Sequence, residues 1–145
     1  MLAMFDTSHL HPIIVHFPIA LLITGFVADT VFLLYKKEAC LSKSGFYLML
    51  AGTLGAIAAV LSGNFFTQEL SGSVEAVRER HETFANITMW LMIVASVIRL
   101  FLLKRGGASP RAALGVYILY LIGVMLVSYT GMLGGTMVYD YLIGI

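Results

Sequence analysis

The stretch PIIVHFPIALLITGFVADTVFLLY, from Pro12 to Tyr35, has a single charged residue and decides the fold class. A helix that crosses about 30 Å of hydrocarbon at ~1.5 Å per residue needs about 20 residues, and this stretch is long enough. Three later stretches meet the same requirement, from Gly45 to Phe66, from Phe84 to Leu103 and from Ala112 to Leu133. They leave little chain between them, so we expect one domain that crosses a membrane four times.

The composition supports a membrane protein. Hydrophobic residues make up 59% of the chain and charged residues 12%, whereas about a quarter of a soluble domain is charged. Lipid cannot solvate unpaired backbone groups, and the apolar runs do not alternate as barrel strands do, so we predict an all-α integral membrane four-helix bundle. The predicted domain covers residues 1–145, with helices over roughly 12–35, 45–66, 75–104 and 112–133 and an interfacial tail over 134–145.

The basic residues predict the orientation. The nine Lys and Arg residues divide as seven against two, and the larger group falls at the first and third connections. Cytoplasmic loops carry the excess of Lys and Arg, so both termini are expected on the periplasmic or outer side of a bacterial inner (cytoplasmic) membrane. The larger group comprises Lys36, Lys37, Lys43, Arg99, Lys104, Arg105 and Arg111, and the smaller one Arg78 and Arg80.

Several classes of function lack support in the sequence. The single cysteine, Cys40, cannot form a disulfide within the chain, and no CxxCH motif is present for covalent c-type haem. No phosphate-binding loop and no basic tract suited to nucleic acid occurs. Four short helices with one buried acid offer little pathway for a transporter. Nothing indicates turnover of a substrate, so enzyme status is left open.

The histidines are the main candidates for chemistry. All four, His9, His11, His16 and His81, fall at the outer end of the predicted bundle and come from two separate helices. We expect His16 and His81 to ligate haem b from both sides, since two imidazoles are a common ligand pair for haem iron. His11 is a further candidate, although it lies about 140° around a regular helix from His16. In the same site Arg80 and Arg78 would meet haem propionates, and second-shell groups would orient an imidazole; these are Asn64, Asn86, Ser128, Tyr129 and Thr130.

Other uses of these residues stay open. Interfacial histidines also cap helices and bind water or lipid headgroups. A zinc or copper site would draw on His9, His11, His81 and either Asp6 or Glu82, but no HExxH or CxxC spacing supports it. A methionine such as Met132 or Met137 is an alternative haem ligand.

Asp29 is the only acid well inside an apolar run, and Arg99 occurs at a similar depth near the inner end of the third helix. An ionised carboxylate at the centre of a membrane helix costs roughly 2.5–3.5 kcal/mol on insertion scales. The first and third helices run in the same direction, so we predict an Asp29–Arg99 ion pair. Its role is structural or, alternatively, proton transfer.

Small residues recur along two of the predicted helices. Such stripes let a neighbouring helix, or a flat ligand, come close to the backbone, and helix packing is the simpler interpretation. The second helix has them at Ala51, Gly55, Ala59 and Gly63, with Gly52 and Ala56 beside them, and the fourth at Gly115, Gly123, Gly131 and Gly135.

Three segments resemble a known family. They are HPIIVHFPIALL from His11 to Leu22, RHETFAN from Arg80 to Asn86 and the closing GMLGGTMVYDYLIGI. Nearly the whole chain resembles the predicted transmembrane family called domain of unknown function 2231. The resemblance implies a four-helix membrane protein, and an electron-transfer setting because some members are associated with or fused to Rieske or cytochrome c modules. The family's histidine positions match His11, His16 and His81, with Asn86 following.

The expected function is therefore a b-type haem-binding membrane subunit that transfers electrons near the periplasmic face, within a larger respiratory or photosynthetic complex. Its expected partners are the lipid bilayer, other membrane redox subunits, a periplasmic cytochrome c or Rieske protein, and quinone. The alternative is a non-catalytic accessory subunit that stabilises a multi-subunit membrane complex, in which the histidines form a polar cap.

Overall fold

The computed structural model describes residues 10–35, 39–66 and 72–141. These residues form α-helices and connecting turns, with no strand among them. The helices are α1 (Leu10–Tyr35), α2 (Ala39–Phe66), α3 (Ser73–Lys104) and α4 (Pro110–Tyr141). Each is long enough and apolar enough to cross a membrane. The predicted all-α fold with four membrane-length helices is confirmed.

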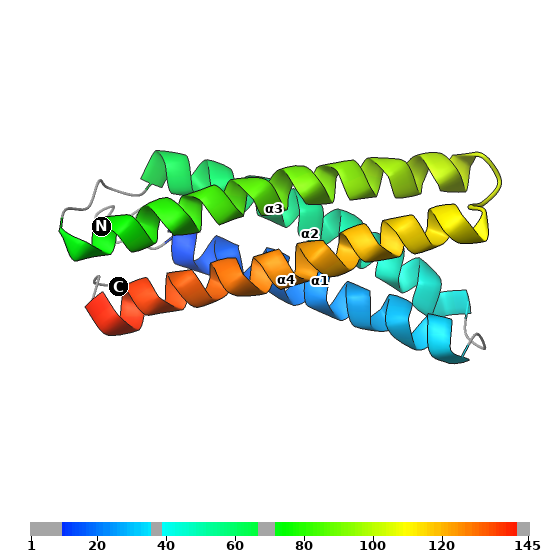
Figure 1. Ribbon diagram of the computed structural model, residues 1–145, viewed down its shortest axis with the longest axis horizontal. Helices are drawn as coiled ribbons and strands as arrows, with labels where there is room; N and C mark the ends of the chain where they lie inside the picture. Colours follow the sequence, from blue (N-terminus) through cyan, green and yellow to red (C-terminus); the bar gives the residue numbers. More distant parts are fainter. Residues whose placement is uncertain (1–9, 36–38, 67–71, 142–145) are drawn as a thin grey trace, which may run out of the picture.

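The helices form two crossed layers. α1 packs along α2 and α3 packs along α4, and the α1–α2 pair runs obliquely behind the α3–α4 pair (Figure 1). α2 also contacts α3 and α4 contacts α1, so α1 and α3 lie diagonally across the bundle. We call the end where α1 and α3 begin and α2 and α4 end the terminal end, and the opposite end the connection end.

Two helix boundaries differ from the prediction by more than two residues. α2 begins at Ala39, six residues before Gly45, so Cys40 lies in its first turn. α4 continues to Tyr141 instead of ending near Leu133. Residues 134–141 contain no proline, and Gly134 lies against the ring of His81, which gives this part of the chain a packing partner. Of the predicted interfacial tail, 142–145 lie outside the described residues.

The turn between α3 and α4 explains why the two helices run antiparallel. Gly106 and Gly107 adopt φ values of 89° and 124°, a region that side chains rarely allow. The N–H groups of both glycines donate to carbonyls in the last turn of α3. Ser109 then caps α4, accepting from the N–H of Ala112 at 3.3 Å.

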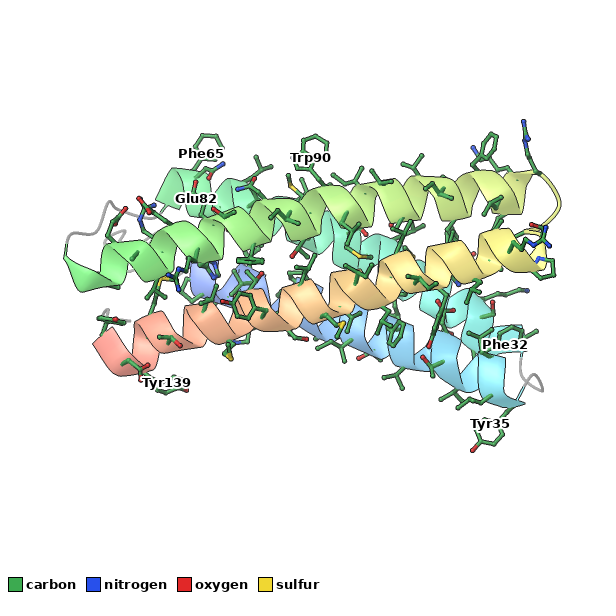
Figure 2. The ribbon with its side chains drawn as sticks, in the orientation of Figure 1. Phe32, Tyr35, Phe65, Glu82, Trp90 and Tyr139 are labelled. Carbon is green, nitrogen blue, oxygen red and sulfur yellow. The ribbon has the colours of Figure 1, made fainter. Side chains whose placement is uncertain are left out.

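The outer surface of the bundle is apolar, as lipid contact requires. Phe65, Trp90 and Tyr139 point away from the bundle (Figure 2), and they are 76%, 62% and 82% exposed. A soluble protein rarely exposes so much contiguous apolar surface. The exposed face is therefore the face that meets the hydrocarbon.

The interior is apolar at its centre and contains a few satisfied polar groups. Leu22, Met49, Met92 and Tyr120, from four different helices, are fully enclosed. Tyr120 donates a hydrogen bond to the carbonyl of Leu22 at 3.0 Å. Among the described residues, no buried side-chain nitrogen or oxygen lacks a hydrogen-bond partner. In lipid this pairing is a requirement, because water cannot replace a missing partner.

The glycines of α2 serve helix packing. A Cβ at Gly52 would come within 2.7 Å of Leu22, and one at Gly55 within 3.2 Å of Pro18, both in α1. The absence of side chains at these two positions lets α1 and α2 approach closely. In α4, a Cβ at Gly131 would come within 3.0 Å of Ile19, whereas Gly135 faces open space.

Replacing Gly52 by alanine is expected to destabilise the protein by about 1–3 kcal/mol, because the new methyl group overpacks the enclosed side chain of Leu22. Gly135→Ala is the matched control, since its methyl group meets no atom within 4 Å, and it should be neutral or slightly stabilising. Unfolding in detergent followed by circular dichroism measures both. Equal stability of the two variants would contradict the packing role of Gly52.

Candidate functional site

Two imidazoles meet edge-on at the terminal end of the bundle. His11 lies in the first turn of α1 and His81 in the N-terminal third of α3, and both side chains are half-buried. Their ring centroids are 6.5 Å apart and the ring planes are nearly perpendicular, at 88°. The two helices are diagonal partners, so the rings meet inside the bundle rather than on its surface.

The other two helices hold these rings in place. Nδ1 of His11 lies 2.8 Å from Oγ of Ser62 in α2, and Nδ1 of His81 lies 3.0 Å from the carbonyl oxygen of Thr130 in α4. Each helix therefore contributes one group, two imidazoles and two hydrogen-bond partners. Ser62 and Thr130 are themselves buried, at 4% and 8% exposed.

The hydrogen bonds determine which nitrogen of each ring carries the proton. A carbonyl only accepts, so His81 must donate from Nδ1 to Thr130. Ser62 donates its one hydroxyl hydrogen to the carbonyl of Ala59 at 2.9 Å, so its oxygen accepts from Nδ1 of His11. In the neutral rings, Nε2 of both histidines then carries a lone pair. That is the arrangement a metal-binding imidazole uses.

A glycine lies beside each ring. A Cβ at Gly63 would come within 3.2 Å of the His11 ring, and one at Gly134 within 3.4 Å of the His81 ring. Larger side chains at these positions would press on the imidazoles. The glycine on α2 thus leaves room for the ring of His11, and the glycine on α4 leaves room for the ring of His81.

Comparison with known proteins identifies the family but not the activity. The family model described as predicted membrane protein (DUF2231) matches residues 7–145. The chain belongs to this family. No curated protein and no solved structure matches this DUF2231 chain. The resemblance inferred from the sequence is confirmed, and the DUF2231 chain is a multi-pass membrane protein with four spans.

The histidine pair in this DUF2231 chain differs from the pair expected from sequence. His81 is one member, but its neighbour is His11 and not His16. The side chain of His16 is exposed, and its Nδ1 lies 2.5 Å from the carbonyl oxygen of Pro12 in the same helix. Five residues rotate a helix by about 140°, so when His11 faces inward His16 faces outward.

Asn86, Arg78 and Arg80, which were expected to support the site, have other surroundings. Nδ2 of Asn86 donates to the carbonyl of Glu82, one turn earlier in α3, at 2.9 Å. Arg80 is exposed, and Arg78 forms ion pairs with Glu75 at 2.7 Å and Glu82 at 3.4 Å. Within the described part of the chain, neither Asn86 nor Arg80 forms a hydrogen bond with either imidazole.

The remaining candidates lie around the pair without joining it. Tyr129 packs edge-on against Phe84, with ring centroids 4.8 Å apart, and Ser128 donates back to the carbonyl of Val124. Asn64 and Met132 are exposed, and Met137 is half-buried. Of the five described groups expected to orient an imidazole, Thr130 is the one that reaches a histidine, through its backbone carbonyl.

Sequence reasoning missed Ser62, although a signal for it exists. Gly52, Gly55, Ala59 and Ser62 follow one another at helical spacings of three, four and three residues, so they share one face of α2. That face packs on α1, as the contacts of Gly52 and Gly55 show. Ser62 is the polar residue on this inward face near the end of α2, so its position could have indicated a hydrogen bond to a histidine of α1.

Among the described residues, the donor set is smaller than zinc or copper sites use. His9 and Asp6 lie outside the described residues, and the carboxylate of Glu82 is bound by Arg78. Within the described part of the chain, no group of three or more His, Cys, Asp or Glu side chains comes together. Protein zinc sites take three or four such ligands, whereas a haem iron needs only two beyond its porphyrin.

A second diagonal pair lies near the connection end. Arg99 of α3 binds the carboxylate of Asp29 of α1 with both terminal nitrogens, one of them at 2.8 Å, so the predicted ion pair is present. The same guanidinium donates to the carbonyl of Ser42 at 3.3 Å and lies over the ring of Phe46, 5.5 Å from its centroid. The side chains of Asp29 and Arg99 are 10% and 16% exposed.

Proposed function

We propose that this protein is a b-type haem-binding membrane subunit that transfers electrons, and that His11 and His81 would hold the haem iron. One observation carries the proposal: two imidazoles on diagonal helices meet edge-on, and each is held at Nδ1 by a neighbouring helix, through Ser62 and Thr130. A haem bound there would supply a one-electron redox couple.

The two rings lie close enough that both imidazoles would be able to hold one haem. The observed separation of the ring centroids is 6.5 Å. The chain's own residues would hold and orient the iron ligands, and the surrounding apolar helices would exclude water.

The basic residues extend the proposal to location and partners. With the connection end on the cytoplasmic side of a bacterial inner membrane, the histidine pair lies near the periplasmic surface. Electrons would then pass between the bilayer side, from quinone or another membrane redox subunit, and a periplasmic acceptor such as cytochrome c or a Rieske protein. This setting corresponds to a larger respiratory or photosynthetic complex.

A dithionite-reduced minus oxidised absorption spectrum of the purified chain tests the proposal. After expression with ample haem supply, we expect a b-type spectrum, and pyridine haemochrome analysis should count a single haem per chain, since only one bis-imidazole pair is offered. A preparation without a Soret band would overturn the proposal.

A structural role is the second candidate, and the same hydrogen bonds favour it. The bond from His11 to Ser62 ties α1 to α2, and the bond from His81 to Thr130 ties α3 to α4. In that case the histidines would form a polar cap on an accessory subunit of a larger membrane complex. The purified chain would then be stable and free of haem.

A further inference from the structure

An apolar groove lies between α3 and α4 near the connection end. It has a volume of about 420 Å³, and every lining residue comes from these two helices. Ile98 and Leu102 line it from α3, and Gly115 and Leu119 from α4. The groove is far along both helices from the histidine pair, so it is independent of the proposed haem site.

The groove exists because α4 has small residues where α3 has large ones. A Cβ at Gly115 would meet no atom within 4 Å, so this position faces open space. Ala112, one turn earlier, also lines the groove. The neighbouring lining residue Val116 is 7% exposed and closes the floor toward the bundle interior. The hollow is thus a consequence of side-chain size and not of an unfilled core.

Cations surround the end of this groove. Lys104 ends α3, Arg105 follows it, and Arg111 lies in the first turn of α4; all three are exposed. The guanidinium of Arg105 lies over the ring of Phe101, 4.3 Å from its centroid, which holds the charge close to the helix pair. Among the described residues at this end, the only acid is Asp29, and Arg99 already binds its carboxylate.

We propose that the groove binds an anionic glycerophospholipid, with an acyl chain along Gly115 and the headgroup phosphate between Arg105 and Arg111. The wall is apolar and the rim is cationic, which is the combination that an anionic lipid complements. A second copy of the chain in the same orientation is a poorer occupant, because it would bring two cationic rims together. A zwitterionic lipid would fill the groove with its acyl chain, but its headgroup would be attracted less strongly to the cationic rim.

Native mass spectrometry of the detergent-purified chain tests this proposal with two probes, phosphatidylglycerol and phosphatidylcholine of identical acyl chains. We expect a single tightly bound phosphatidylglycerol and a preference over phosphatidylcholine. Each Lys or Arg near an anionic surface changes binding by about fivefold, so Arg105→Gln/Arg111→Gln should lower phosphatidylglycerol binding more than tenfold and abolish the preference.

Gly115→Leu tests the groove itself. The leucine side chain has room to enter the hollow, and it should lower binding of both lipids without unfolding the protein. Gly135→Leu is the matched control, because it adds the same side chain to the same helix at a position that also faces open space, near the terminal end. Equal binding of the two lipids, or binding unchanged by Gly115→Leu, would overturn the proposal. A change of oligomeric mass in Gly115→Leu would also overturn it, by assigning the groove to a second copy.

Discussion

Replacing His81 or His11 by alanine is expected to abolish the b-type absorption spectrum, whereas His16→Ala should retain it. Each of the first two variants removes one of the imidazoles whose ring centroids lie 6.5 Å apart. A six-coordinate haem iron then loses one of its two protein ligands. His16 is exposed and bonded within its own helix, so its removal leaves the pair intact. Absorption spectra of the three purified variants, at matched protein concentration, measure the result.

His16→Ala also serves as the control for folding, because it makes the same substitution in the same helix as His11→Ala. Circular dichroism and size-exclusion profiles should match the parent chain in all variants that are compared. Ser62→Ala adds a graded readout: loss of a second-shell partner typically lowers metal affinity about 10–100-fold, so haem should be retained but more easily extracted. Loss of the spectrum in His16→Ala, with His11→Ala unaffected, would contradict the ligand pair.

The fold was predictable from the sequence because one physical requirement dominates it. Four long apolar runs must become helices in lipid, and short connections must make neighbours antiparallel. Asp29 and Arg99 were predictable as a pair for a related reason, since each is the lone charge at its depth in an apolar run. To predict their pairing it was enough to know that the two helices run in the same direction, and the four-span topology gives that direction.

The histidine pair was not predictable in the same way, because it depends on the rotation of α1 about its own axis. His11 and His16 point to different sides of α1, so the rotation decides which of them faces inward. The contacts that set the rotation are Leu22 against Gly52 and Pro18 against Gly55. These contacts follow from packing of α1 on α2 and not from the residues around the histidines. The extension of α4 to Tyr141 has a similar origin, in the contact of Gly134 with His81.

Arg99→Met is expected to lower the stability of the protein by about 3–5 kcal/mol, because it leaves the Asp29 carboxylate as an unpaired charge inside the bundle. The double variant Asp29→Leu/Arg99→Met removes both charges and should recover most of that loss, since an apolar pair of similar volume fits a low-dielectric interior. Unfolding of the detergent-purified variants by added denaturing detergent, followed by circular dichroism, measures the difference.

Lys43→Met is the matched control, because it removes an exposed cation at the same end of the bundle and should change stability by less than about 0.5 kcal/mol.

The double variant Asp29→Leu/Arg99→Met also separates two roles of the ion pair. If the pair only holds α1 and α3 together, the double variant should bind as much haem per folded chain as the parent. The pair lies near the opposite end of the bundle from the histidines. A proton-transfer role predicts intact stability in the double variant with altered electron-transfer rates. If Arg99→Met is no less stable than Lys43→Met, the Asp29 carboxylate must find another partner, and the ion pair does not hold the two helices together.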